Sequence, residues 1–446
     1  MVPGENMSEK RRQVVILGAG FGGLQVARGL DGADMDVVIV DRNNHHLFQP
    51  LLYQVASAGL APGTITVPIR SVVGRQKNTR VLLADAERID LDRQEVVLAD
   101  GEHLPYDDLV VAVGARNNFF GNTHWAKHAT GLKDVRDALS IRERILLSFE
   151  AAERSNDPNE RQRLTTFVVI GGGPTGVEMA GAISELGRQV LADDYPNVPA
   201  DSVRVVLVEM AKRVLTSFDE DLSYEAERQL EELGVELRLG QPVTDIQDGY
   251  VMLGDERLDV SVVVWASGVK AEAIAAESAM PQDWNGRLMV DGHCCVKGHP
   301  SVFAIGDAAH FVPEGEEEPL PGLGAVAMQQ GIFLAKQLRR RAARKPLETF
   351  KYKDRGTMAT VGRSRAVVQG GIKMTGFFAW IAWCLVHVIL LMGFRNRAVV
   401  LFNWVWAYVT YKRGARLITG QVPIRTTDQA LAEKADEAPG QLRESA

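Results

Sequence analysis

The chain has 446 residues, of which 46% are hydrophobic and 24% are charged, an ordinary composition for a globular protein. This length exceeds one typical core and predicts two or three domains. The net charge of −7 hides an asymmetry, because residues 336–425 carry 18 Lys and Arg against two acids, a local charge of +16. Three cysteines, two of them adjacent, exclude a disulfide-stapled scaffold and indicate a reducing, cytoplasmic environment.

The first predicted element is a buried strand that runs into a glycine loop and then a helix. Residues 13–30 read QVVILGAGFGGLQVARGL. In this pattern Gly18 allows a tight turn, Gly20 lets the backbone approach a pyrophosphate, and Gly23 lets the helix pack closely on the strand. The helix N-terminus then faces the phosphates. The loop therefore predicts a dinucleotide site, whose other members are Phe21 and Gly22.

The next two predicted strands supply further residues of this site. Residues 36–42, DVVIVDR, end at Asp41 and Arg42, and a carboxylate at Asp41 is placed to accept hydrogen bonds from ribose hydroxyls. Residues 108–115, DLVVAVGA, form another buried strand that ends near Gly114. Strand, glycine loop, helix and acid together make the prediction specific, whereas the glycine pattern alone is weak.

The same pattern then restarts about 150 residues later, which indicates an internal duplication. Residues 165–183, TTFVVIGGGPTGVEMAGAI, repeat the strand, loop and helix, and VRVVLVEM repeats the second strand and ends near Glu209. A carboxylate at Glu209 repels a 2′-phosphate and favours NADH over NADPH, although nearby Arg213 leaves NADPH open. The third strand, at 260–269, ends near Gly268. The second loop consists of Gly171, Gly173, Pro174, Thr175 and Gly176.

Three further stretches complete this part of the chain. Residues 300–309, PSVFAIGDAA, predict a buried strand with Asp307 just past its end. A helix is expected to follow from about residue 323 to 344. The polar residues 155–163 suit a link between domains.

These motifs resemble the two-dinucleotide-binding-domain flavoproteins, which have a glutathione-reductase-like fold. The resemblance implies an α/β protein with two Rossmann-like dinucleotide-binding domains and a C-terminal membrane-docking helical segment. It implies FAD at the first loop, NADH at the second, and Asp307 on the ribityl and phosphate part of the flavin nucleotide. The expected segments are an FAD domain (11–130 and 286–345), an inserted NADH domain (131–285), a membrane-associated region (346–425) and a disordered tail (426–446).

Within these flavoproteins the chain is most similar to the type II NADH:quinone oxidoreductases. The specific stretches are HHLFQPLLYQVASAGLAP, AVAMQQG and GFRNRAVVLFNWVWAYVTYKRGARLI. The resemblance implies NADH oxidation and two-electron reduction of a membrane quinone, ubiquinone or menaquinone, without proton pumping, in the respiratory chain.

The resemblance also implies roles for single residues. Glu178 is expected near the nicotinamide and flavin, and Gln329, with Gln330 beside it, is expected toward the quinone. Ala325 stands where some relatives carry a glutamine, so the quinone contacts depart from that pattern. No cysteine precedes Cys294, so the cysteine pair that disulfide reductases carry near the flavin is absent from the first domain.

The C-terminal region contains 21 consecutive uncharged residues, 374–394, followed by a second apolar run with Trp404, Trp406 and Tyr408. Basic residues surround both runs. The favoured interpretation is a pair of helices that lie in one leaflet of an anionic membrane, on its cytoplasmic face. A single span and a buried homodimer interface stay open. Nucleic acid is disfavoured, because base stacking does not need 18 apolar residues in a row.

Two other functions stay open from the sequence. A soluble ferredoxin or rubredoxin reductase would need an acidic partner and no apolar C-terminal segment. A redox-sensing flavoprotein scaffold would bind NADH but react slowly with every quinone.

Overall fold

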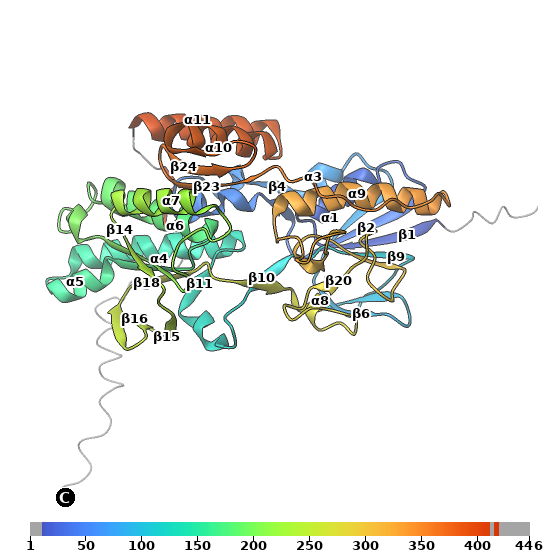
Figure 1. The fold of residues 1–446 in the computed structure, drawn as a ribbon, viewed down its shortest axis with the longest axis horizontal. Coiled ribbons are helices and arrows are strands. Elements are labelled where there is room, and N and C mark those ends of the chain that lie inside the picture. The colour runs from blue at the N-terminus through green and yellow to red at the C-terminus, as the bar shows by residue number, and fades with distance from the viewer. Residues whose placement is uncertain (1–10, 411–413, 419–446) are drawn as a thin grey trace, which may run out of the picture.

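The computed structural model describes residues 11–410 and 414–418. The tail predicted to be disordered, 426–446, lies outside these residues. Figure 1 shows two α/β units side by side, with a layer of two helices above the left-hand unit. This arrangement confirms the predicted α/β class with two parallel-sheet cores.

The first unit is built on a five-stranded parallel sheet. Its strands in spatial order are β21 (Val302–Ala304), β9 (Asp108–Val111), β1 (Arg12–Leu17), β2 (Met35–Asp41) and β5 (Thr79–Leu83). Strand β21 follows the whole second unit in the sequence, so a late segment completes the first sheet. The inner strands are runs of Val, Ile and Leu because the sheet is covered on both faces.

Helices α1 (Phe21–Gly29) and α9 (Gly324–Ala342) pack on this sheet against one another. Their contact is close because it is lined by glycine. A Cβ on Gly29 would lie 2.4 Å from the Cβ of Ala335, and a Cβ on Gly331 would lie 2.3 Å from the carbonyl oxygen of Gly22. The predicted helix at 323–344 is therefore present, and it begins where the second half of the first unit meets the glycine loop.

The second unit repeats the first, which confirms the duplication. Its parallel sheet has the order β11 (Ala129–Gly131), β18 (Val262–Trp265), β12 (Thr166–Ile170), β13 (Arg204–Glu209) and β14 (Val235–Leu239). Its main helices are α4 (Val135–Arg154), α6 (Pro174–Glu185) and α7 (Glu220–Glu232).

The prediction that residues 155–163 link two domains was wrong. The short helix α5 (Pro158–Leu164) joins α4 to β12 inside the second unit. Asp157 accepts a hydrogen bond from the Asn159 amide at 2.9 Å and caps this helix, so the polar composition reflects an exposed helix and its cap.

Two short strands connect the units, as Figure 1 shows near the middle of the molecule. Strand β10 (Ala115–Asn117) leaves the first unit and pairs in antiparallel fashion with β19 (Val269–Ala271), which returns from the second. Each strand follows a glycine with positive φ, +75° at Gly114 and +77° at Gly268. These glycines therefore turn the chain at both crossings.

Each unit also carries a three-stranded antiparallel sheet at its lower edge. These sheets are β6 (Ala86–Asp90), β7 (Glu95–Leu98) and β8 (His103–Pro105), and β15 (Val243–Gln247), β16 (Tyr250–Leu253) and β17 (Glu256–Asp259). The segment HHLFQPLLYQVASAG forms β3 (His45–Leu47), which pairs with β4 (Thr66–Pro68), and the one-turn helix α2 (Leu52–Ala56).

The C-terminal region is a small antiparallel sheet with two helices above it. The strands are β23 (Thr357–Gly362), β24 (Arg365–Gln369) and β25 (Met374–Thr375), and the helices are α10 (Gly376–Leu390) and α11 (Phe394–Thr410). Strand β23 lies directly on α6, because a Cβ on Gly181 would come within 1.7 Å of the Val361 carbonyl oxygen. The two helices therefore rest on the second unit through this sheet.

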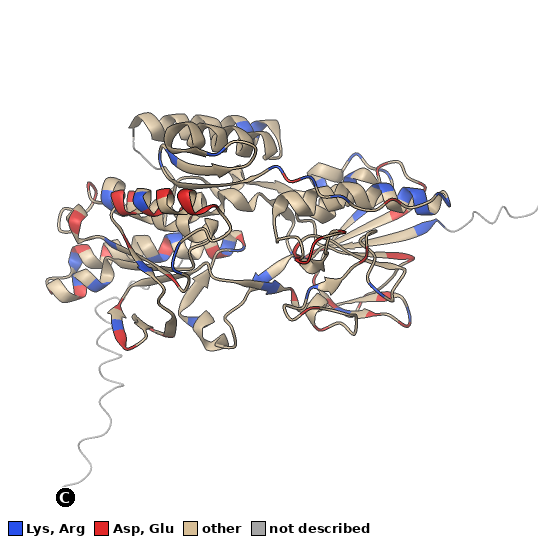
Figure 2. Cartoon of the chain, in the orientation of Figure 1, with Lys and Arg blue, Asp and Glu red and all other residues tan. Residues whose placement is uncertain are grey.

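The uncharged run of residues 374–394 forms one helix, α10, which ends at Leu390, and the second apolar run forms α11, which begins at Phe394. The expected pair of helices is therefore present. Within the described residues, no helix combines the length and apolar character that a membrane span requires. Figure 2 shows that α10 and α11 carry few charged residues, whereas α7 beneath them is densely charged.

Candidate active site

The first glycine loop has the geometry that its sequence predicts. Gly18 has φ +93°, and a Cβ on Gly23 would lie 1.9 Å from the Gly18 carbonyl oxygen. At Gly20 an added Cβ would meet no atom of the described residues within 4 Å. The turn and the helix contact thus need glycine for steric reasons, while Gly20 faces open space where a pyrophosphate can approach.

Asp41 closes this loop from the end of β2. Its Oδ2 accepts from the Ala19 amide and its Oδ1 from the Asn43 amide, both at 2.7 Å. Burial raises the pKa of Asp41, and the two amide hydrogen bonds oppose that effect. The neighbouring Arg42 pairs with Glu272 at 2.6 Å and so ties the first unit to the segment after β19.

The second loop repeats this geometry. Gly171 has φ +113°, a Cβ on Gly176 would lie 1.8 Å from the Gly171 carbonyl oxygen, and Gly173 faces space free of described atoms. Glu209 accepts from the Gly172 amide at 2.5 Å and from the Ala211 amide at 2.7 Å. Pro174 and Thr175 begin helix α6.

Arg213 does not face this loop in a way that would favour a 2′-phosphate. Its guanidinium donates to the Phe218 carbonyl at 2.8 Å, the Ser223 hydroxyl at 2.6 Å and the Thr216 carbonyl at 3.0 Å. These bonds tie the side chain to the loop at residues 216–218 and to helix α7. Glu209 is the acid that bonds the second glycine loop itself.

The first site fits FAD at its other end as well. Asp307 follows β21 in a single 3-10 turn, Gly306–Ala308, and its Oδ1 would lie 3.0 Å from a Cβ on Gly322. Lys133 lies close enough to interact electrostatically with Asp307: burial lowers the pKa of Lys133, and the carboxylate opposes this. An open glycine loop, a helix N-terminus and this acid are the groups that a flavin dinucleotide needs.

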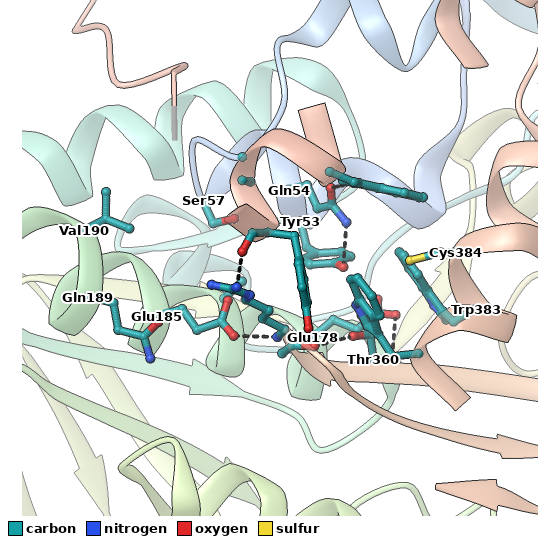
Figure 3. A pocket seen from close by; sticks show the side chains of 18 residues that line it. Tyr53, Gln54, Ser57, Glu178, Glu185, Gln189, Val190, Thr360, Trp383 and Cys384 are labelled. Atoms are coloured by element: carbon teal, nitrogen blue, oxygen red, sulfur yellow. Dashed lines mark hydrogen bonds between the residues drawn. The ribbon is translucent and has the colours of Figure 1, made fainter. Parts of the chain in front are cut away.

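A cavity of about 120 Å³ lies along α6 from Glu178 to Glu185 (Figure 3). Its walls come from α2, α6, β23, α10 and α11, so it is enclosed by both units and the C-terminal helices. The lining side chains used below are Tyr53, Gln54, Glu178, Trp383, Cys384 and Trp404.

Glu178 presents a carboxyl group to this cavity from the first turns of α6. The Thr360 amide approaches its Oε1 at 3.5 Å. Burial raises the pKa of Glu178 to about 8, and the Thr360 amide and the Trp383 indole only partly oppose this effect. Burial therefore favours the protonated form of Glu178, whose side chain borders the cavity.

Tyr53, Gln54 and Trp404 form a hydrogen-bonded chain on the opposite wall. The Trp404 indole N–H donates to Gln54 Oε1 at 2.7 Å, and Gln54 Nε2 donates to the Tyr53 hydroxyl oxygen at 2.8 Å. Burial, followed by the charge of Glu178, raises the pKa of Tyr53, so its hydroxyl stays protonated.

Gln329 and Gln330 point elsewhere. Gln329 exchanges two hydrogen bonds with the Lys353 backbone, both at 3.0 Å. Gln330 is buried and accepts from the Gly306 amide at 2.7 Å. The structure therefore brings Gln330 to the Asp307 turn and Gln329 to the segment before β23, and neither lines the cavity around Glu178.

The cysteines and His387 have packing roles. Cys294 is buried in the core of the first unit, while Cys384 lines the cavity with a pKa that burial raises to about 12. His387 stacks on Trp383 at 4.0 Å, and burial lowers its pKa to about 4.

The sequence assigned no role to Tyr53, Gln54, Trp383 or His46, and it indicated Trp404 only as part of the second apolar run. His46 is buried, and its Nδ1 lies 3.0 Å from the Ala19 carbonyl oxygen in the first glycine loop. One signal was available: polar Tyr53 and Gln54 interrupt an apolar stretch. Their partner Trp404 lies 350 residues away in sequence, so no local pattern indicates it.

Comparisons with known proteins agree with this geometry. The family model described as pyridine nucleotide-disulphide oxidoreductase matches residues 12–331. A type II NADH:quinone oxidoreductase of Mycobacterium tuberculosis is 40% identical, over 97% of this chain and 96% of its own length. A type II NADH:quinone oxidoreductase of Staphylococcus aureus is 31% identical, over 80% and 89%.

A solved structure shows the same fold. The structure of NDH2 from Plasmodium falciparum in complex with NADH superposes with a TM-score of 0.83 at 21% identity, covering 92% of this chain and all of that one. Nearly full-length similarity to named relatives extends through the C-terminal helices. The chain belongs to the pyridine nucleotide-disulphide oxidoreductase family and, within it, to the type II NADH:quinone oxidoreductases.

Proposed function

We propose that this protein oxidises NADH with FAD as its cofactor and reduces a membrane quinone by two electrons, without pumping protons, as an entry point to the respiratory chain. One observation carries the proposal: α6 begins at the second glycine loop and brings Glu178 to a cavity walled by α10 and α11. A single helix thus borders both the nucleotide loop and a cavity under the apolar helices.

The two units divide the binding between them. In this proposal Asp41 and Glu209, which each accept a backbone amide of their own glycine loop, also accept hydrogen bonds from ribose hydroxyls, and the two helix N-termini bind the phosphates. FAD, when bound, supplies hydride acceptance and electron transfer, and the protein supplies orientation and electrostatics. We propose that Gln330 keeps Asp307 in place through Gly306, and that Gln329 steadies the strand leading into the cavity.

Glu178 is the proton-holding residue in this proposal. Quinone reduction consumes two protons, and a carboxyl group with a pKa of about 8 holds one at the cavity wall under neutral conditions. It lies two residues after Gly176, so it remains close to the nucleotide loop as well.

The C-terminal helices supply a membrane-docking surface, which we define as the outward face of α10 and α11. Its most exposed apolar side chains include Phe378 (74%), Ile389 (66%), Phe402 (65%) and Val409 (72%). Arg395 and Arg397 lie exposed at the junction of the two helices. An apolar face with a basic margin fits an anionic lipid surface.

This lipid surface is the occupant we propose, on the cytoplasmic face of the membrane, where free thiols persist. A quinone with a long apolar tail can then pass from the bilayer into the cavity beneath the same helices. A homodimer that covers this face is the competing outcome. Sedimentation with and without anionic vesicles distinguishes the two.

The test is NADH oxidation by the FAD-loaded protein with a short-chain quinone, compared with NADPH and with a ferredoxin as acceptor. Fast NADH-dependent quinone reduction is the expected result. Rapid flavin reduction without quinone turnover would overturn the proposal, and ferredoxin reduction in its place would indicate a soluble reductase.

A further inference from the structure

The segment LLYQVASAG and the helix α11 meet at the cavity through one directional hydrogen-bond chain. An indole N–H is a donor only, so Trp404 requires the atom of Gln54 that faces it to be the amide oxygen. The other end of the same amide is then the NH₂ group, which faces the Tyr53 hydroxyl oxygen at 2.8 Å. Trp404 thereby sets the direction of both bonds.

The direction of the bond from Gln54 determines where the hydroxyl hydrogen of Tyr53 points. Because its oxygen accepts from Gln54, its own hydroxyl hydrogen must point away from Gln54. Within the described residues, the hydroxyl oxygen of Tyr53 takes part only as an acceptor, and the side chain lines the cavity. A buried donor without a partner costs stability, so the hydroxyl hydrogen is available to a group that enters the cavity.

We propose that Tyr53 donates a hydrogen bond from its hydroxyl to a carbonyl oxygen of the bound quinone, and that Trp404 enforces this orientation through Gln54. This inference rests on the proposed function, because it takes the cavity to be the quinone site. Tyr53 contacts the substrate, while Gln54 and Trp404 are positioning residues.

Aromatic contacts hold the hydrogen-bonded residues Trp404 and Tyr53 in place. The Trp404 ring packs against Trp383 with centroids 5.6 Å apart, and Trp383 lies 6.3 Å from the Tyr53 ring. These tilted and edge-on ring contacts therefore hold Trp404 even when its N–H is removed. Since Trp404 belongs to the helix that carries the membrane-docking surface, seating of α11 is coupled directly to the orientation of a substrate-binding hydroxyl.

The first experiment measures binding of a short-chain quinone to the oxidised, FAD-loaded protein by calorimetry, without NADH. Tyr53→Phe removes the donor, and Trp404→Phe removes the N–H while it keeps an aromatic ring. Each should weaken binding roughly threefold to tenfold, the usual contribution of one neutral hydrogen bond. The double variant should bind no more weakly than Tyr53→Phe alone, because both changes remove the same interaction.

Gln54→Glu is the most informative variant. It keeps the shape of the side chain, and as a carboxylate it reverses the direction of the hydrogen bond between residue 54 and the Tyr53 hydroxyl. A carboxylate still accepts from Trp404, but it also accepts from Tyr53 and turns the hydroxyl hydrogen away from the cavity. When protonated, the same side chain donates to Tyr53 as Gln54 does, so binding should match that of the unaltered protein at low pH and should weaken as much as in Tyr53→Phe once the carboxyl group ionises. A merely structural role for Gln54 predicts that quinone affinity, relative to the unaltered protein, does not fall as pH rises.

Matched controls exist elsewhere in the chain. Tyr195→Phe removes a tyrosine hydroxyl that bonds Glu150 at 2.8 Å, and Trp284→Phe changes a tryptophan that is 82% exposed. Both should bind quinone as the unaltered protein does. In every variant, FAD content and the rate of flavin reduction by NADH should be unchanged.

Unaltered quinone affinity in Tyr53→Phe would overturn this inference. Where that variant loses FAD, infrared difference spectra of quinone on the unaltered protein decide, because a hydrogen-bonded carbonyl absorbs at lower frequency and an unshifted band would refute the contact. An unaltered protein that neither binds nor reduces any quinone would overturn the proposed function instead, so the two failures are distinguishable.

Discussion

Replacing Glu178 with Gln should change how the stability of the protein depends on pH. The pKa of Glu178 is about 8 in the folded protein, against 4.5 for an unperturbed glutamate. Between these values the unfolded chain has released the proton and the folded chain has kept it. Rising pH therefore favours unfolding, by up to about 1.4 kcal/mol per pH unit in the middle of this interval.

The total effect follows from the same two values. The penalty is absent below pH 4.5 and is complete above pH 8, where it reaches about 5 kcal/mol. Glutamine has nearly the same shape and does not titrate. The Glu178→Gln variant should thus gain stability relative to the unaltered protein as pH rises, and this difference should level off above pH 8.

The assay is urea unfolding of both FAD-loaded proteins at several pH values from 5 to 9. The variant Glu317→Gln, in an exposed loop, is the control for the chemical change itself. A constant free-energy difference between Glu178→Gln and the unaltered protein across this range would refute the burial argument. The same variant should lose quinone turnover while it retains FAD, and unchanged turnover would remove Glu178 from the mechanism.

Three further outcomes are expected. Glu209→Gln should lower the preference for NADH over NADPH in kcat/KM by roughly tenfold, because the charge that repels a 2′-phosphate is gone; an unchanged ratio would contradict that role. Gly176→Ala brings a Cβ to 1.8 Å from the Gly171 carbonyl oxygen and should impair NADH binding while flavin absorbance persists. Gly23→Ala brings a Cβ to 1.9 Å from the Gly18 carbonyl oxygen and should lose FAD. Equal flavin content in the two variants would argue against separate sites. Phe378→Asp combined with Phe402→Asp should weaken co-sedimentation with anionic vesicles more than tenfold, since each change removes a largely exposed apolar ring from the docking face; undiminished vesicle binding would exclude that face.

The dinucleotide loops could be predicted from the sequence because their requirements are local. Gly18 and Gly23 satisfy a turn and a helix contact within six residues of each other, and the same holds for Gly171 and Gly176. Asp41 follows one strand later in the same βαβ unit. Short-range steric rules of this kind leave a readable pattern in the residue types.

The function of the glutamines on α9 could not be read in this way. Gln329 and Gln330 are adjacent, yet they bond to different backbone segments, at Lys353 and Gly306. Which partner each side chain finds depends on the direction in which it leaves the helix and on what packs there. Neither property is encoded in spacing along one helix.

The sequence by itself determined that there are two duplicated nucleotide-binding units, an acid at each, and an apolar C-terminal segment, because periodicity, glycine spacing and composition report on local backbone geometry and burial. Only the tertiary structure placed the two predicted helices, α10 and α11, beside α6, and brought Trp404, Gln54, Tyr53 and Glu178 to one cavity. Residues separated by 350 positions in sequence become hydrogen-bond partners because packing, and no local rule, brings α11 onto α2. The pKa of Glu178 has the same origin, since desolvation depends on every element that surrounds the carboxyl group.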